Sequence, residues 1–192
     1  GPLEALRDLD EEPARVIPRR LATREDVAPI DRVEIDAIEA AAVDDLRMVR
    51  SDLLEEAGIE PPQTMDEMLA AAQALNTPPD RYGLVIGSRT DEAWWDFMHY
   101  FWAFGGQLYD PETLEVTVNN EAGVAALTFY SDLLQKYQVV SPDVTTYGFN
   151  EILTALAQDR AAMGVEWMAA TQSLTDCEQS PLVCDKLAYE LI

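Results

Sequence analysis

The densest run of large apolar residues lies between Asp91 and Gly106, where aromatic side chains recur at helical spacing. At about 100° per residue, these residues form two neighbouring stripes on one helix. The first stripe is Trp94, Phe97, Met98 and Phe101, and the second is Trp95, His99 and Trp102. Asp96 and Tyr100 interrupt the apolar surface on the far side. A helix of this kind is packed on two sides, or packed on one side and turned toward a ligand on another.

The rest of the chain alternates between amphipathic helices and short apolar strands. We expect helices over residues 31–43, 51–57, 64–75, 120–137, 149–158 and 169–174. We expect strands over residues 46–49, 82–86, 161–167 and 187–192. Residues 107–118 have the character of a hairpin, with alternating apolar positions after Asp110–Pro111. The alternation of helices and strands indicates the α/β class.

Several helix ends carry a specific signal. Gly58 is expected to end the helix over residues 51–57, and Thr64 with Glu67 forms a capping box at the start of the next one. Asn120 is expected to cap the long helix that follows the hairpin. The apolar spacing of that helix predicts five inward-facing side chains, which are Val124, Leu127, Tyr130, Leu133 and Leu134.

The composition excludes some partners. The chain has 192 residues, enough for one domain or one and a half, and its formal net charge is −23. The 36 acidic residues against 13 basic ones argue against nucleic acid or an anionic membrane as a partner, because phosphate binding needs clustered Lys and Arg. No apolar run approaches the ~18 residues that span a bilayer, and no signal peptide is visible. The Gly1–Pro2 start resembles the scar of a cleaved tag, so an export signal could have been removed.

Two cysteines, Cys177 and Cys184, flank a short segment that contains Pro181 and turn-forming residues. With one histidine and no other cysteine in the chain, the usual zinc site is not expected, nor is a thioredoxin-type pair. A disulfide that closes this loop is the favoured interpretation, and it indicates an oxidising compartment. Two free thiols are the alternative.

The candidate binding residues lie where two predicted strands end. Glu166 and Trp167 finish the strand over residues 161–167, while Trp94 and Trp95 open the helix that follows the strand over residues 82–86. Ligands of α/β proteins collect at the carboxyl ends of strands. An aromatic face offers a sugar ring an apolar surface, and a carboxylate accepts hydrogen bonds from its hydroxyls. His99 and Trp102, further along the helix, are expected to be core residues.

The order of these features resembles a known family. The segments that carry the resemblance are residues 53–67, Tyr82-Gly83-Leu84, the aromatic helix ending in Gly105-Gly106, residues 119–134, and Gly164-Val165-Glu166-Trp167. In this order they resemble the extracellular solute-binding proteins of ABC importers, in the maltose-binding-like, mostly sugar-binding group. The resemblance covers residues 46–192, whereas residues 1–45 are expected to form a charged and helical N-terminal arm.

The resemblance implies a type II periplasmic-binding-protein-like fold, with helices packed on a small mixed sheet. Such proteins have two lobes with the ligand between them, and this chain looks like the C-terminal lobe. The resemblance implies that Trp95 and Trp167 stack on the ligand, or Trp94 if the alignment shifts by one. It also implies hinge closure, ABC permease subunits as partners and an extracytoplasmic location.

The sequence also fits two other functions. A lobe that acts alone could use its exposed half-cleft as an interaction surface, for example in a homodimer. A binding protein for a non-sugar, cationic solute would also suit the acidity and the pairing of Trp with Glu. Catalysis has no support, because no nucleophile, phosphate-binding or metalloprotease motif is present, and no cofactor or metal is expected.

Overall fold

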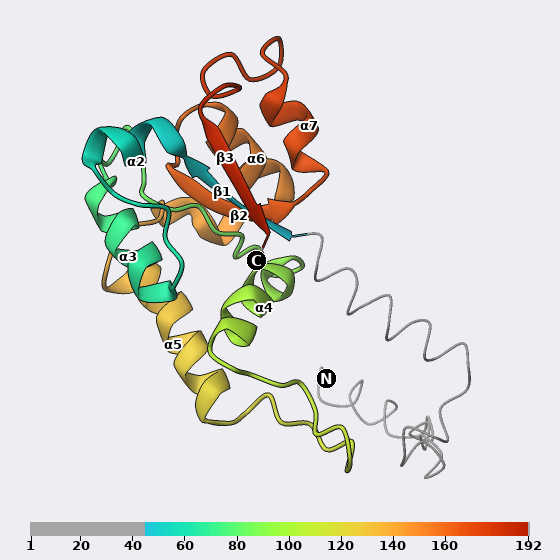
Figure 1. Cartoon of the computed structure of the whole chain (residues 1–192). Helices are drawn as coiled ribbons and strands as arrows, with labels where there is room; N and C mark the ends of the chain where they lie inside the picture. The colour runs from blue at the N-terminus through green and yellow to red at the C-terminus, as the bar shows by residue number, and fades with distance from the viewer. Residues whose placement is uncertain (1–44, 192) are drawn as a thin grey trace, which may run out of the picture.

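The computed structural model describes residues 45–191, which form a small sheet with helices on both faces (Figure 1). The expected N-terminal arm over residues 1–45 and the helix over residues 31–43 therefore lie almost entirely outside the described residues. The strand order is β2-β1-β3, and both pairings are antiparallel. The central strand β1 (Asp45–Arg50) lies between β2 (Met163–Trp167) and β3 (Leu187–Leu191).

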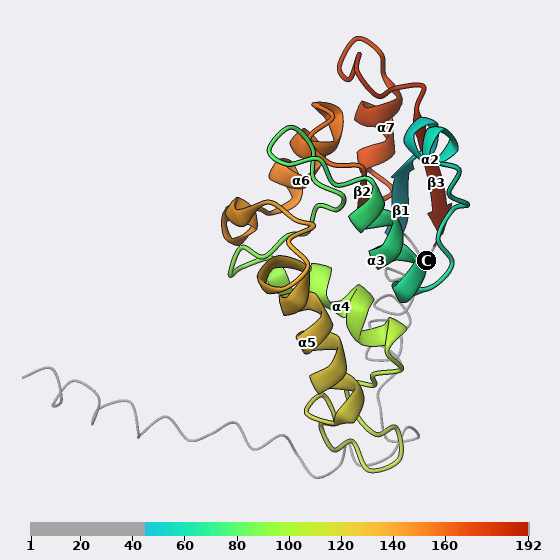
Figure 2. The same ribbon diagram turned by 90° about the vertical axis from the view of Figure 1, so that its left-hand side faces the viewer.

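Side chains of β1 alternate between two hydrophobic clusters, as expected for a strand covered on both faces. Met48 joins the cluster formed with α6 (Phe149–Ala157) and α7 (Ala170–Thr175). Val49 joins the larger cluster on the other face. The helices of that larger cluster are α2 (Ser51–Ala57), α3 (Met65–Ala74), α4 (Ala93–Ala103) and α5 (Glu121–Gln135). Figure 2 shows α4 and α5 lying together on the side of the molecule away from α7.

The helix ends follow the sequence signals closely. Gly58 follows α2 in the left-handed conformation, with φ of 65°, and its N–H donates to the carbonyls of the last turn. The Thr64 side chain accepts a hydrogen bond from the Glu67 N–H at 3.2 Å, and the Glu67 carboxylate accepts one from the Thr64 N–H at 3.1 Å. Asn120 caps α5 through the Gly123 N–H. A short 3₁₀ helix, η3 (Pro142–Thr146), precedes α6.

The strand expected over residues 82–86 is not a regular strand. Tyr82 and Val85 each form a single parallel bridge, to Ala161 and Gly164. The backbone between them is hydrogen-bonded elsewhere, because the Gly83 N–H donates to a side chain and the Leu84 N–H donates to a loop carbonyl. The continuous ladder is therefore broken, and the sheet is mixed only through these two bridges.

The long helix α5 is rotated relative to the sequence prediction. Val124 and Leu127, expected to face inward, are exposed, whereas Gly123 and Ala126 are buried. Leu133 is buried, as expected. A Cβ on Gly123 would lie 2.0 Å from the Val118 carbonyl oxygen. This close approach turns the small-residue face of the helix inward, so Val124 and Leu127 face solvent. Tyr130 and Leu134 pack against the core at half-buried positions, as expected.

Cys177 and Cys184 form a disulfide, which confirms the favoured interpretation of the two cysteines. The bond closes the turn that follows α7 and leads toward β3. Nearby, Ser180 is buried and donates from its hydroxyl to the Ser173 carbonyl at 2.9 Å. The covalent link and this hydrogen bond together hold the turn against α7. Tyr109 and Val116 also pair in an antiparallel bridge, consistent with the expected hairpin.

Candidate functional site

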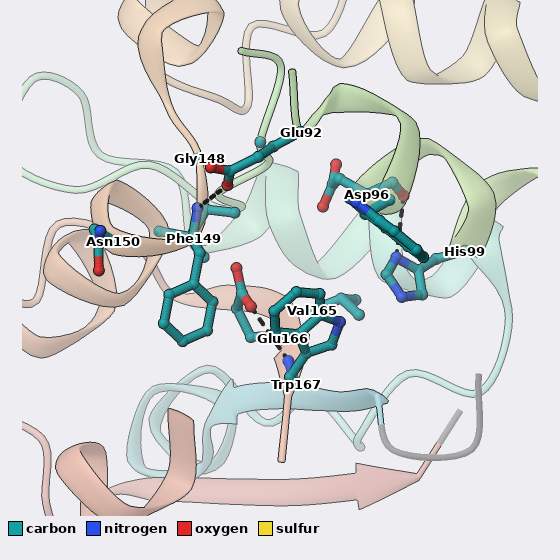
Figure 3. A pocket seen from close by; sticks show the side chains of 12 residues that line it. Glu92, Asp96, His99, Gly148, Phe149, Asn150, Val165, Glu166 and Trp167 are labelled. Carbon is teal, nitrogen blue, oxygen red and sulfur yellow. Dashed lines mark hydrogen bonds between the residues drawn. The ribbon is translucent and has the colours of Figure 1, made fainter. Parts of the chain in front are cut away.

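A cavity of about 360 Å³ opens between α4, the start of α6 and the carboxyl end of β2 (Figure 3). Three of the four side chains expected to contact a ligand line it, namely Trp95, Glu166 and Trp167. Trp94 does not line it. The other lining residues are Gly87, Glu92, Asp96, His99, Gly148, Phe149, Asn150, Ile152 and Val165.

Aromatic rings form one wall of this cavity. The Trp95 and Trp167 rings meet edge to face, with centroids 6.4 Å apart, and the Phe149 ring lies 5.6 Å from that of Trp167. Trp95 is 56% exposed and Trp167 is 44% exposed, so both indoles keep a large face open to solvent. Phe149 was not among the residues that the sequence pattern predicts to contact a ligand. Its position directly after Gly148, as the first residue of α6, was the available signal.

A hydrogen-bonded cluster ties the first turns of α4 and α6 together. The Glu92 carboxylate accepts a hydrogen bond from the Phe149 N–H at 2.6 Å and pairs with the Arg89 guanidinium. Arg89 also donates to Glu151 at 3.1 Å, and the same Glu151 oxygen accepts from the Gly148 N–H at 3.0 Å. These contacts fix the distance between the helix that carries Trp95 and the helix that carries Phe149.

Two carboxylates lie deep in the site. Asp96 and Glu166 are each only 7% exposed, and in Figure 3 their carboxylates point toward the same space from opposite sides. A Glu166 oxygen accepts from the Trp167 N–H at 3.2 Å. Burial, together with the nearby charge of Asp96, raises the pKa of the Tyr130 hydroxyl, which donates to the Gly87 carbonyl at 2.7 Å. Sequence spacing placed Asp96 on the far, polar side of its helix, and the structure corrects that.

The second aromatic stripe of α4 faces outward rather than into the core. His99 is half-buried and belongs to the cavity, with its Nδ1 3.0 Å from the Asp96 carbonyl. Trp102, expected in the core, is 42% exposed and lines a second, apolar cavity of about 380 Å³ with Met65 and Met68. The core face of α4 is formed by Met98, Tyr100 and Phe101, and the Tyr100 ring contacts Phe129 and Tyr130 of α5.

Within residues 45–191, no group of three His, Cys, Asp or Glu side chains is placed to hold a metal ion. Nor does any helix in that range have the length and apolarity needed to cross a membrane. The site offers aromatic faces and carboxylate oxygens in a concave space. Such a surface can hold a small polar molecule with both apolar and hydrogen-bonding faces.

The fold and the position of the cavity at a strand end are those of one lobe of a type II periplasmic-binding-protein fold. Residues 27–176 match the family described as bacterial extracellular solute-binding protein. The chain therefore belongs to this family. The match begins at residue 27, inside the segment over residues 1–45 that we expected to lie outside the resemblance.

Solved structures agree with this assignment. The maltose-bound MalE3 of T. maritima is 30% identical to this chain, with a TM-score of 0.70. The match covers 76% of this chain and 37% of the MalE3 chain. A solute-binding protein of Agrobacterium vitis with bound D-mannitol is 25% identical with a TM-score of 0.69, and the match covers 77% of this chain and 36% of that one. A Thermotoga lettingae protein with bound α-D-tagatose is 27% identical with a TM-score of 0.65, covering 76% and 38%. The chain thus spans little more than a third of the length of these proteins.

Proposed function

We propose that this chain is the C-terminal lobe of an ABC-importer binding protein and that its cavity binds a carbohydrate or polyol. The observation that carries the proposal is the convergence of Trp95 and Trp167, from different elements, on one open cavity. Similar structures contain bound maltose, D-mannitol and α-D-tagatose, all of them rich in hydroxyl groups. A binding role, rather than catalysis, suits a site built from aromatic rings and hydrogen-bond acceptors.

In the cavity, the aromatic rings and the carboxylates would contact different parts of the ligand. The exposed indole faces of Trp95 and Trp167 would pack against the C–H groups of a sugar. The carboxylates of Asp96 and Glu166 would accept hydrogen bonds from its hydroxyls, and such bonds are strong because the acceptor is charged. Trp94, which is exposed but lies outside the cavity, would have no role in binding.

In this proposal the ligand would be enclosed when a second lobe closes over the aromatic wall, a hinge motion used by periplasmic binding proteins. The ligand drives closure because it binds the closed state more tightly than the open one. Membrane permease subunits would then receive the closed form. An extracytoplasmic location is supported by the family and by the disulfide, since disulfides persist in oxidising compartments.

The four tryptophans of the chain provide a direct test. Indole ¹H–¹⁵N signals can be recorded during titration with maltose, D-mannitol or tagatose, at concentrations high enough for the weak binding of one lobe. We expect the Trp95 and Trp167 signals to shift together and saturate, while the Trp94 signal stays in place. If none of these compounds moves the Trp95 and Trp167 signals, the proposed function is wrong.

A further inference from the structure

The second cavity lies beside the candidate site and shares two of its lining residues, His99 and Val165. In Figure 3, His99 lies at the end of the first cavity opposite Asn150. The two volumes, about 360 and 380 Å³, both fall within the ~300–1,000 Å³ that small-molecule sites occupy. The two cavities are therefore neighbours, with His99 and Val165 common to both.

Helix α4 carries one stripe of ring side chains from the first cavity to the second. Trp95, His99 and Trp102 are spaced by four and then three residues, so they share a face of the helix. Trp95 lines the first cavity, His99 lines both, and Trp102 lines the second. Two turns of α-helix advance about 11 Å, so the stripe extends aromatic surface well beyond the first cavity.

The sheet bounds both cavities in the same way. Trp167 and Val165 are two positions apart on β2, so their side chains point to one face of the sheet. Trp167 lines the first cavity and Val165 lines both. Arg47 of β1, which pairs in register with Val165, lines the second cavity. A helix and a strand thus each continue from one cavity into the other.

The chemistry of the second cavity differs from that of the first. Apolar side chains such as Met68 and Trp102 form most of its wall. Its polar lining residues are Arg47, His99 and Tyr100, and the described residues contribute no carboxylate, amide or aliphatic hydroxyl side chain to it. A sugar ring placed there would lose water from its hydroxyl groups and find few acceptors, whereas an apolar group gains free energy from the same transfer.

The second cavity has a buried floor and an open rim. Met68 and Tyr100 are almost fully buried, whereas Trp102 is 42% exposed. A large exposed apolar side chain at the edge of a cavity is typical of a binding surface. Met65 and Met68 are flexible, and their sulfur atoms make favourable contacts with aromatic rings. The cavity therefore suits a flat apolar group, and an aromatic ring best of all.

On the premise of the proposed function, we propose that the site takes a glycoside whose aromatic aglycone lies in the second cavity. The sugar would pack on Trp95 and Trp167, and the aglycone would extend past His99 to contact Trp102 and Met65. A sugar without an aglycone leaves the apolar wall of the second cavity in contact with water and binds more weakly. The ligand class is thus an amphipathic glycoside rather than a free sugar.

Pairs of glycosides that differ only in the aglycone test this inference in the 192-residue chain. They are methyl and phenyl glucoside and methyl and phenyl maltoside, each as the α and the β anomer. Dissociation constants can be read from the Trp95 and Trp167 indole signals. We expect at least one phenyl glycoside to bind about tenfold more tightly than its methyl partner, as suits one partly buried ring.

The position of the aglycone can be observed directly. The phenyl glycoside should shift the Trp102 indole signal, and its ring protons should show nuclear Overhauser contacts to the methyl group of Met65 or Met68. The methyl partner should shift the Trp95 and Trp167 signals and leave the Trp102 signal in place. This comparison separates binding in the second cavity from binding in the first.

Two variants should remove the preference for the phenyl glycoside. Ala103→Leu adds bulk at the exposed rim of the second cavity, and Trp102→Ala removes its ring, so each should reduce the preference to less than about threefold. Ala125→Leu adds the same bulk to an exposed position of α5, and Trp94→Ala removes the same ring from a position outside both cavities. Both control variants should keep the tenfold preference.

The outcomes distinguish this inference from the proposed function. Equal affinity of every phenyl glycoside and its methyl partner overturns the inference, whereas maltose, D-mannitol and tagatose decide the proposed function separately. A phenyl preference that survives both Ala103→Leu and Trp102→Ala also overturns the inference, because the aglycone then binds elsewhere. If the Trp102 signal moves with protein concentration and with no glycoside, a second copy of the chain occupies the cavity and the inference is wrong. If neither the sugars nor the glycosides bind, both proposals fall together.

Discussion

Trp95 and Trp167 meet edge to face at 6.4 Å, although one opens a helix and the other ends a strand far along the chain. Their contact brings α4 and β2 together at the mouth of the cavity. Edge-to-face pairs add about 0.5–1.5 kcal/mol beyond the area that they bury. The pair is therefore both a structural contact and the open aromatic surface of the proposed binding site.

Removal of the Trp95 ring should weaken ligand binding without unfolding the protein. Trp95→Ala is expected to raise the dissociation constant for a bound carbohydrate by about tenfold, which corresponds to the loss of one aromatic contact. Trp94→Ala is the matched control, because it removes the same ring from the neighbouring position, outside the cavity. Titration of both variants checks this, and an equal or larger loss in Trp94→Ala would contradict the assignment of Trp95.

Glu92 should stabilise the junction between α4 and α6. Glu92→Ala leaves the part-buried Phe149 N–H without its acceptor at 2.6 Å, which should cost about 1 kcal/mol of unfolding free energy. Asp91→Ala is the control, since the exposed Asp91 carboxylate pairs with Arg89 and does not accept from the Phe149 N–H. Little change in unfolding free energy is expected for this variant. Urea unfolding of both variants measures the difference. Equal midpoints would show that the Phe149 hydrogen bond is dispensable.

Gly83 is packed too closely to accept any side chain. A Cβ at this position would lie 1.8 Å from the Ala72 carbonyl oxygen, which belongs to the backbone of α3. Gly83→Ala should therefore lower the unfolding free energy by at least about 3 kcal/mol, or prevent folding. At Gly87 the nearest atom is a methyl group of Ile152 at 3.0 Å, which can rotate away. Thermal melts should show a much smaller effect for Gly87→Ala, and similar losses would argue against this packing.

The Arg50–Asp52 pair should add to acid sensitivity. The hydrogen bond from Arg50 holds the pKa of Asp52 below its usual value of 3.8. A lowered pKa in the folded state gives stability that is present above pH 4 and is lost as the pH falls toward 3. Because Asp52 is more than a third exposed, screening limits this contribution to about 0.5 kcal/mol. Between pH 5 and pH 3, Asp52→Asn should lose less unfolding free energy than the unmodified chain. If both proteins lose the same amount, the Arg50–Asp52 pair does not contribute to the acid sensitivity.

The disulfide should stabilise the turn that follows α7. A loop with a sequence separation of 7 between Cys177 and Cys184 is short, so the expected contribution is about 2 kcal/mol. Reduction with dithiothreitol should lower the unfolding free energy to that of the Cys177→Ser/Cys184→Ser double variant. The reductant should have no effect on the double variant itself. If it also destabilises the variant, the loss has a cause other than this bond.

Local signals predicted much of this fold. The capping box of Thr64 with Glu67 and the left-handed Gly58 involve residues a few positions apart, so the sequence alone contains both partners. The same holds for the disulfide, whose two cysteines have no competing partner in the chain. The C-terminal end of β2 was visible because the apolar run stops at Trp167, whereas the strand begins at Met163, two residues later than expected.

The misplaced residues depended on distant contacts. Val124 and Leu127 face solvent because the Val118 carbonyl closely approaches Gly123, which no periodicity encodes. Trp102 was expected in the core but is exposed, and Asp96 was expected on the polar side of its helix but is buried. The reason is that Tyr100, not Trp102, packs against α5. Phe149 lies in the site because Arg89 and Glu92 hold the start of α6 against α4. These partners are far apart in the sequence. Apolar spacing shows that a helix has a buried face, but packing decides which face it is.

The order of the strands has a consequence for synthesis. Among the described strands the central strand β1 is made first, yet both of its neighbours, β2 and β3, come from the last part of the described chain. During translation its two edges therefore stay unpaired until residues 163–191 have left the ribosome. Unpaired edges of this kind invite aggregation, and pairing across such long separations is slow. The nascent protein would depend on chaperone protection until β2 and β3 emerge.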